Sequence, residues 1–227
     1  MKLTAEQITQ IEEILVLKGL KYDDLKLEVT DHIASEIEVL MQEENISFKV
    51  AFIEVFIKWK WQLKPGNNGL WLGRGFSGPK IVMDKFTSYT KSRLVYILSA
   101  SVPLTLATIG LMHFLNPNMA ILIFTKVIRT LFLFEALLIA TGWILIWKSK
   151  RTTTYSYLFK KRSILVFFQP LIIAAGFIPF NRLLEGDLDI QIAFTYFLFT
   201  LFLFLIFDLS LVFKHFQFEK NLSLSKL

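Results

Sequence analysis

The second half of the chain alternates long apolar runs with short polar segments. From Leu94 to Thr125 there is no Asp, Glu, Lys or Arg, and a helix needs about 20 apolar residues to cross the hydrocarbon core of a bilayer. Further runs of comparable length follow, separated by the turn signal Asn116-Pro117-Asn118 and by short polar links. We therefore predict four transmembrane helices, at about 94–115, 119–147, 163–180 and 190–213.

The first 64 residues show a different pattern, in which apolar residues recur at helical spacing between charged ones. Thr4 and Gln7 form a capping-box signature that opens a helix ending near Leu17. A second helix is predicted over about 23–44 and a third from Ser47 onward. The expected apolar stripe of the third helix is Phe48, Ala51, Phe52, Val55, Phe56 and Trp59. The expected fold is all-α, with a cytoplasmic three-helix domain over residues 1–64 followed by a four-helix transmembrane bundle.

A glycine-rich connector, residues 65–93, joins these two parts. Gly73-x-Gly75-x-x-Gly78 matches a dinucleotide-binding fingerprint by its letters, but no βαβ unit surrounds it and Pro79 interrupts the helix that the fingerprint requires. Apolar and basic residues are interleaved here instead, which predicts a segment lying along the cytoplasmic membrane surface. The residues expected at that surface are Trp71, Arg74, Phe76, Lys80 and Lys85.

Composition agrees with a membrane protein and divides the charge unevenly. Hydrophobic residues make up 54% of the chain, including 23 phenylalanines, which is more than a soluble domain carries. Residues 1–64 carry 8 Lys and 12 Asp or Glu, a net charge of −4, whereas the remaining residues carry 17 basic and 7 acidic side chains, a net charge of +10. The basic residues flank apolar runs, which favours contact with anionic lipid headgroups over nucleic acid.

The basic residues also predict the orientation of the chain. They lie before the first run, between the second and third, and after the fourth, which by the positive-inside bias are the cytoplasmic segments. Residues 1–64 are polar and charged throughout, so no secretory signal is expected. We therefore expect a multi-pass protein of the inner (cytoplasmic) membrane with both termini inside, including a cytoplasmic tail at 214–227.

A small set of polar residues lies within the predicted spans. Glu135 is 12 residues before Trp147, about 18 Å of helix, and so falls near the middle of the membrane, where an ionised carboxylate is costly. Thr105 and Thr200 reach a similar depth on the first and fourth spans, and Gln169 lies nearer the cytoplasm on the third. Glu135 is expected either to pack as a protonated structural acid, hydrogen-bonded within the bundle, or to line a proton or ion path between protomers.

Part of the N-terminal sequence resembles a known type of domain. The residues are Leu27-Glu28-Val29-Thr30-Asp31-His32-Ile33, then Glu36, then Ser47 followed by Ala51-Phe52. This pattern is similar to the small helical HAAS-type and "permease prefix" domains that precede membrane spans in bacterial proteins. The resemblance covers about 22–63 and implies a domain joined to several spans, in some members linked to transcription regulators or transport proteins.

The acidic face of the second helix is the expected partner-binding surface. The candidate residues are Glu28, Asp31, His32 and Glu36. Glu28, His32 and Glu36 share one helix face at a spacing of four, but one histidine with two carboxylates is a poor ligand set for a transition metal, so a solvated face is expected and no metal is assigned.

No arrangement typical of catalysis is visible in the sequence. No Ser/His/Asp set, paired catalytic carboxylates or phosphate loop is recognisable, and the chain contains no cysteine, which excludes disulfides and thiolate chemistry. No enzyme activity and no cofactor are expected. The leading hypothesis is a membrane scaffold or regulatory subunit whose acidic cytoplasmic domain binds a protein partner, with homo-oligomerisation possible. The alternatives are an oligomeric pore or transport component that uses Glu135, and a membrane-tethered protein that sequesters a transcription factor.

Overall fold

The computed structural model describes residues 2–67, 72 and 76–224. The described chain is helical apart from one short hairpin. It forms two compact units: unit 1 comprises Met1–Lys91 and Arg151–Thr154, and unit 2 comprises Ser92–Lys150 and Tyr155–Leu227. Unit 1 therefore includes more of the chain than residues 1–64, because most of the connector, up to Lys91, and a distant four-residue loop belong to it.

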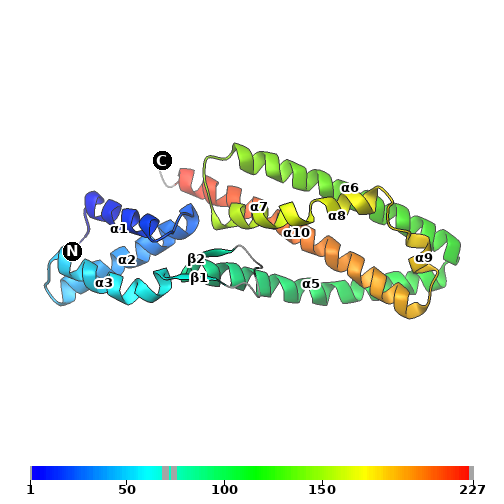
Figure 1. The fold of residues 1–227 in the computed structure, drawn as a ribbon, viewed down its shortest axis with the longest axis horizontal. Coiled ribbons are helices and arrows are strands. Elements are labelled where there is room, and N and C mark those ends of the chain that lie inside the picture. Colours follow the sequence, from blue (N-terminus) through cyan, green and yellow to red (C-terminus); the bar gives the residue numbers. More distant parts are fainter. Residues whose placement is uncertain (1, 68–71, 73–75, 225–227) are drawn as a thin grey trace. The chain divides into compact units, whose positions relative to one another are not determined.

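Three helices open unit 1, and local sequence signals explain their ends (Figure 1). They are α1 (Ala5–Leu17), α2 (Asp23–Glu43) and α3 (Phe48–Leu63). The predicted capping box at the start of α1 is present, since the Thr4 hydroxyl accepts the Gln7 N–H and the Gln7 side chain accepts the Thr4 N–H. Gly19 follows α1 with a φ of +91°, a left-handed conformation that favours glycine and ends the helix.

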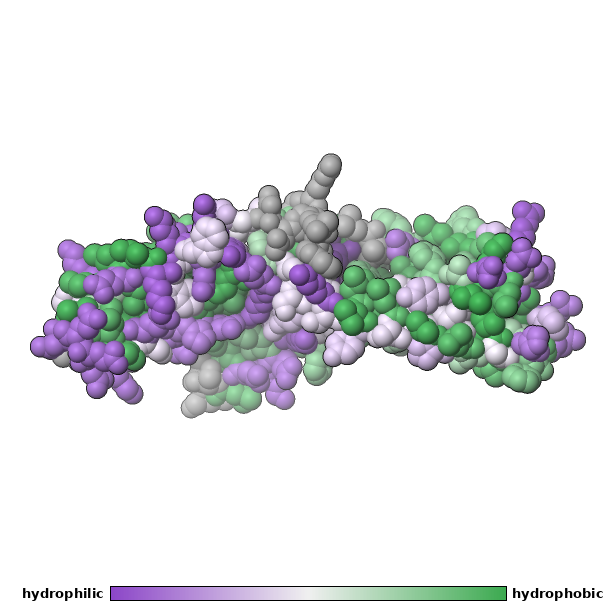
Figure 2. Space-filling view, turned by 90° about the horizontal axis from the view of Figure 1, so that it is seen from below, coloured by the Kyte–Doolittle hydropathy of each residue, from purple (hydrophilic) through white to green (hydrophobic). Residues whose placement is uncertain are grey.

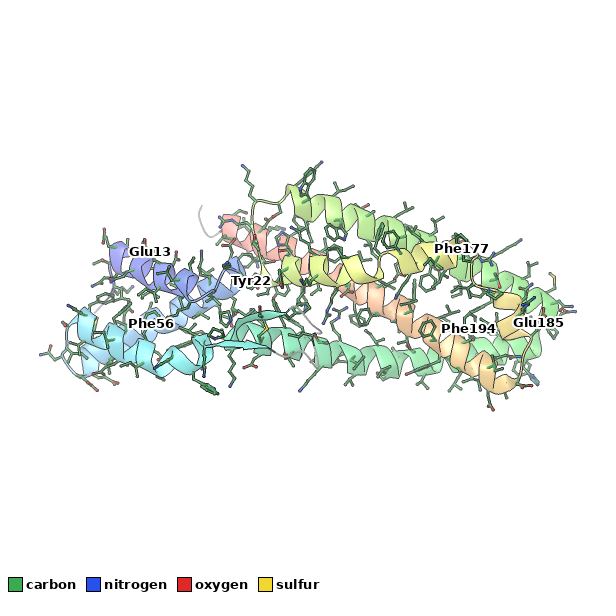
Figure 3. All side chains as sticks on the ribbon, viewed as in Figure 1. Glu13, Tyr22, Phe56, Phe177, Glu185 and Phe194 are labelled. Carbon is green, nitrogen blue, oxygen red and sulfur yellow. The ribbon has the colours of Figure 1, made fainter. Side chains whose placement is uncertain are left out.

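The core of unit 1 joins these helices to the connector. Fully or nearly fully buried side chains from α1–α3 include Ile11, Leu15, Leu25, Val29, Ile33, Ile37, Ala51, Val55, Trp59 and Leu63. The connector adds Phe76 and Phe86, and the Phe86 ring packs edge-on against Tyr22 at a centroid distance of 5.7 Å (Tyr22 is labelled in Figure 3). Burial of each large side chain contributes about 1.5–3 kcal/mol, so the connector is part of the folded unit.

The connector itself forms a hairpin and then a helix. Strands β1 (Pro65–Asn67) and β2 (Ser77–Pro79) pair antiparallel, with Gly66 opposite Gly78. The long helix α5 (Lys80–Phe114) starts directly after β2. Period-based analysis of the sequence missed this hairpin because three-residue strands rich in glycine and proline carry no alternation of polar and apolar residues.

Three helices of the described chain are long and apolar enough to cross a membrane. They are α5, α6 (Pro117–Lys148) and α10 (Leu188–Leu224). Large hydrophobic areas are exposed over these helices, whereas hydrophilic residues predominate over α1–α3 (Figure 2). Extended exposed apolar surface of this kind is the property of a protein whose surface faces lipid.

The predicted third span, 163–180, is not one helix. The chain there forms α7 (Thr154–Val166), α8 (Phe168–Ala174) and α9 (Phe180–Leu184). Pro170 has no N–H to donate to the carbonyl of Val166, four residues earlier, and α7 ends at that residue. Gly176, with a φ of +84°, lies just beyond α8. Two local breakers thus divide a segment that hydropathy alone assigned to a single span.

Within unit 2 the helices pack closely. A Cβ added at Gly142 of α6 would lie 3.1 Å from both Phe159 of α7 and Val212 of α10, so glycine is what permits this approach. Helix α8 lies against α6, and α9 packs against α10 through Phe180 and Phe194, whose ring centroids are 5.3 Å apart (Phe194 is labelled in Figure 3).

Candidate functional site

The acidic start of α2 binds the loop that follows α6, and we call this arrangement the acidic clamp. It consists of Asp23, Asp24 and Lys85 together with the loop Arg151–Thr154, all within unit 1. Thr153 and Thr154 are fully buried by it. Two segments about 130 positions apart in the sequence are therefore held together by a few polar side chains.

Asp24 is the centre of the acidic clamp. Its side chain is only 5% exposed, and its Oδ1 accepts the main-chain N–H of Thr154 at 2.8 Å while its Oδ2 accepts the Thr154 hydroxyl. Thr154 is the first residue of α7, so the carboxylate satisfies an N–H that has no partner within its own helix and lies at the positive end of the helix dipole.

Asp23 completes the contact with the loop. Its main-chain N–H donates to the Thr152 carbonyl at 2.8 Å, and its Oδ2 accepts the Thr152 N–H at 3.3 Å. Arg151 lies 3.8 Å from the same carboxylate. The loop backbone is thus fixed by both the main chain and the side chain of one residue.

Lys85 of α5 balances the charge of the acidic clamp. Its Nζ is 3.7 Å from Asp24 Oδ2 and 3.0 Å from Glu28 Oε2. Lys85 is one of the residues that we expected at the membrane surface, and the structure places it in this ion-pair network. A contact of Lys85 with lipid would have to compete with two carboxylates.

The other residues expected at the membrane surface lie in several different environments. Phe76 is 6% exposed and packs against Phe86 in the core of unit 1. Lys80 lies over the ring of Trp61, with 4.6 Å from Nζ to the ring centroid. Trp71 and Arg74 lie outside the described residues. Lipid contact by this group stays a prediction.

The expected partner-binding face of α2 is partly occupied by contacts within the chain. Asp31 and His32 are exposed. Glu28 pairs with Lys85, and Glu36 is bound by Lys58 Nζ at 2.9 Å and by the Trp59 indole N–H at 3.2 Å. The described residues contain no group of acidic and histidine side chains arranged to hold a metal ion.

A buried charge cluster lies in unit 2 at Asp208. Arg93 of α5 is 2.8 Å from Asp208 Oδ1, and Arg162 of α7 is 3.7 Å from the same atom. Asp208 of α10 is 1% exposed. Arg93 also donates to the Phe204 carbonyl at 3.2 Å, with its guanidinium over the Phe204 ring. One carboxylate and two cations therefore tie three helices together.

Asp208 was not among the site residues predicted from the sequence, although a signal for its pairing was available. Arg93 and Arg162 precede the first and third apolar runs, and Asp208 lies close to the end of the fourth. In a bundle of antiparallel spans these three positions fall at the same depth, so opposite charges there are expected to pair.

The polar residues predicted inside the spans do not form one cluster. Glu135 is 2% exposed on the inward stripe of α6, and neither of its carboxylate oxygens has a hydrogen-bond partner among the described residues. The Thr200 hydroxyl donates to Ser101 Oγ at 3.1 Å, and the Thr105 hydroxyl donates to the Ser101 carbonyl at 2.8 Å. Gln169 is exposed. Ser101, which links α5 to α10, was not predicted.

A serine, a histidine and a glutamate meet at the ends of α6 and α10, a set that sequence analysis did not recognise. His215 Nε2 is 3.0 Å from Ser149 Oγ and 3.6 Å from Glu219 Oε1, and the Ser149 hydroxyl donates to Glu219. In a catalytic triad the acid binds the imidazole nitrogen opposite to the one that faces the nucleophile. Here both of these contacts use Nε2 and His215 is fully buried, which differs from the arrangement of contacts in a catalytic triad.

We expect Asp24→Ala to loosen the acidic clamp. The variant leaves the buried Thr154 N–H without its acceptor, which should lower the free energy of unfolding by about 1–3 kcal/mol. Hydrogen exchange at 152–154 and tryptic cleavage after Arg151 should both become faster. Asp31→Ala, an exposed position on the same helix, serves as the matched control. Equal exchange rates in the two variants would contradict the role assigned to Asp24.

Asp208→Asn should destabilise unit 2 more strongly. It removes the carboxylate between two buried guanidinium groups, and breaking a buried ion pair in this way costs about 3–5 kcal/mol. Thermal unfolding in detergent measures the loss, with the exposed Asp189→Asn on the same helix as control. Adding Arg93→Gln to the Asp208→Asn variant should recover part of the lost stability, because only one buried cation then remains. A single variant as stable as its control would show that the cluster is not stabilising.

Comparison of the chain with protein-family models, with curated proteins and with solved structures finds no match. The resemblance to HAAS-type and permease-prefix domains therefore stays a prediction.

Proposed function

We propose that the chain is a non-enzymatic regulatory or scaffold subunit of a membrane assembly, in which cytoplasmic unit 1 binds a protein partner and unit 2 anchors it. The observation that carries the proposal is the acidic clamp. Because the loop Arg151–Thr154 belongs to unit 1, the chain passes between the units at three points, 91/92, 150/151 and 154/155. A partner that changes the conformation of unit 1 would act on the segments on both sides of that loop.

Hydrogen bonds at the helix ends support a position of both termini on one side of the membrane. Thr152 and Thr154 are bonded to α2, so the loop after α6 lies on the same side as unit 1. Ser149, next to that loop, is bonded to Glu219 near the end of α10, which brings the C-terminal end of the chain to that side too. This relation is independent of hydropathy.

The length of α10 then supports four crossings rather than three. With 37 residues, α10 is about 55 Å long, more than the thickness of a bilayer. Its first residue therefore lies on the opposite side from Glu219, and the chain between Tyr155 and Asp187 has to make the return crossing. Helices α7, α8 and α9 form that crossing in the proposal, with one side of α8 packed against α6, since broken helices are tolerated in membranes where neighbouring protein packs against them.

The side that carries unit 1 is assigned to the cytoplasm by its basic residues. Lys148, Lys150, Arg151, Lys214 and Lys220 all lie on it. The positive-inside bias favours this orientation and, with it, the inner membrane.

The position of Glu135 disfavours the pore alternative. A path between protomers requires this side chain on the outer surface of its own chain, but Glu135 faces inward on the buried stripe of α6. The transcription-factor alternative shares the partner-binding property and differs only in the identity of the partner.

The proposed topology predicts the labelling pattern of single cysteines. Because the chain has no cysteine of its own, each introduced residue is the only thiol. Asn118→Cys and Asp187→Cys should react with a membrane-impermeant maleimide in intact cells, whereas Lys150→Cys and Ser223→Cys should react only after permeabilisation. Labelling of Ser223→Cys in intact cells would contradict four crossings with both termini inside.

The proposed function predicts a specific partner and a tight membrane. Cross-linking in native membranes, followed by purification of the full chain in mild detergent, should give one co-purifying protein in defined stoichiometry. Binding of this partner should change the maleimide labelling of Lys150→Cys. Asp24→Ala should alter that change. Vesicles containing the purified chain should hold an ion gradient, with Glu135→Gln no different. Ion flux that depends on Glu135 would overturn the proposal in favour of a pore.

A further inference from the structure

Helix α3 carries a second apolar face that the core of unit 1 does not cover. The side chains of Ile53, Ile57 and Trp61 are 51%, 65% and 62% exposed. They border a groove of about 800 Å³, here called the α3 groove, which runs between α3 and the end of α1. Half-buried Phe52 and Phe56, whose ring centroids are 4.5 Å apart, also line it (Phe56 is labelled in Figure 3).

The charge around the α3 groove is opposite to that of the N-terminal segment as a whole. Four of the eight lysines of residues 1–64 line the groove, and none of the twelve acidic residues does. They are Lys18, Lys58, Lys60 and Lys64. Lys58 is paired with Glu36, but the other three form no ion pair with the described acidic residues. An apolar groove with unbalanced positive charge at its rim fits an apolar and anionic occupant.

We infer that the α3 groove binds an acidic amphipathic helix of a protein partner. Such a helix inserts apolar side chains at positions i, i+3 or i+4, and i+7, and the volume of the groove accommodates several of them. Its acidic residues would then face the three unbalanced lysines. Trp61 is the expected anchor, because a large aromatic side chain between a groove and basic residues is typical of binding hot spots.

The shape of the groove favours a helix over a lipid surface. Tryptophan and lysine together also occur where proteins contact bilayer interfaces. However, a bilayer surface is flat, so it is contacted by side chains that protrude from the protein. Here the aromatic side chains Phe52 and Phe56 are recessed between α1 and α3. A recessed apolar floor is reached by the side chains of a helix and is left empty by a flat surface.

This inference rests on the proposed function and names the class of partner and the surface used. The expected contact surface is then the basic rim of the α3 groove. It replaces the acidic face of α2, where two of the four candidate residues are already paired within the chain. The two surfaces predict partners of opposite charge, which makes them separable by experiment.

The test uses the full chain in detergent and a synthetic fluorescent peptide of about 16 residues, with Leu and Phe at helical spacing and Glu on the other face. Binding measured by anisotropy should saturate, and it should weaken by about tenfold or more in Trp61→Ala and in Lys60→Glu with Lys64→Glu. Lys49→Glu, on the same helix but outside the groove, should bind normally. A peptide with Lys in place of Glu should bind the charge-reversed variant and not the original chain.

Three results with the purified chain would overturn the inference. The first is equal binding of the acidic and basic peptides. The second is burial of a spin label at Ile57→Cys in anionic phosphatidylglycerol bilayers, seen as relaxation by oxygen rather than by a water-soluble agent, which would assign the groove to lipid. The third is loss of oligomers of the chain itself in the charge-reversed variant, which would assign it to a second copy. A cross-linked partner unaffected by the groove variants would refute the inference alone, whereas no partner under any condition would refute the proposed function.

Discussion

The organisation of unit 1 depends on the interactions of the Asp24 carboxylate. It is buried, yet it accepts two hydrogen bonds from Thr154 and lies near the charge of Lys85. A buried charge is tolerated only when it is paired and hydrogen-bonded, and this one obtains its partners from α5 and from the first residue of α7. Unit 1 is therefore complete only when the N-terminal helices, the connector and the loop after α6 are all in place.

The same requirement distinguishes the acidic residues of unit 2 from one another. Asp208 forms ion pairs with two arginines, whereas Glu135 forms no ion pair with the described residues. A carboxylate that is paired near the end of a bundle stabilises the packing of its helices, and a solitary one in the middle has to be accommodated by the packing around it.

The periodic parts of the fold were predictable from the sequence. The capping box at Thr4, the helices that became α1–α3, and the long apolar helices α5, α6 and α10 follow from local hydrogen bonding and from the spacing of apolar residues. The sequence also encodes the break at Phe167, because Pro170 has no N–H to bond the preceding helical turn. A hydropathy average over many residues does not register a single proline. The connector is ambiguous from the sequence alone, because its apolar side chains fit a membrane surface and a protein core equally well.

What the sequence by itself determined was the helical class, the apolar segments and the division of charge between the N-terminal 64 residues and the remainder. The tertiary structure alone decided which charges meet: Asp24 with Thr154 and Lys85, Asp208 with Arg93 and Arg162, and Ser149 with His215 and Glu219. It also decided that one apolar face of α3 is left uncovered beside lysines. The reason is physical, since helical periodicity follows from hydrogen bonds a few residues apart, whereas these pairings join residues 46 to 130 positions apart in the chain and exist only once the helices have packed.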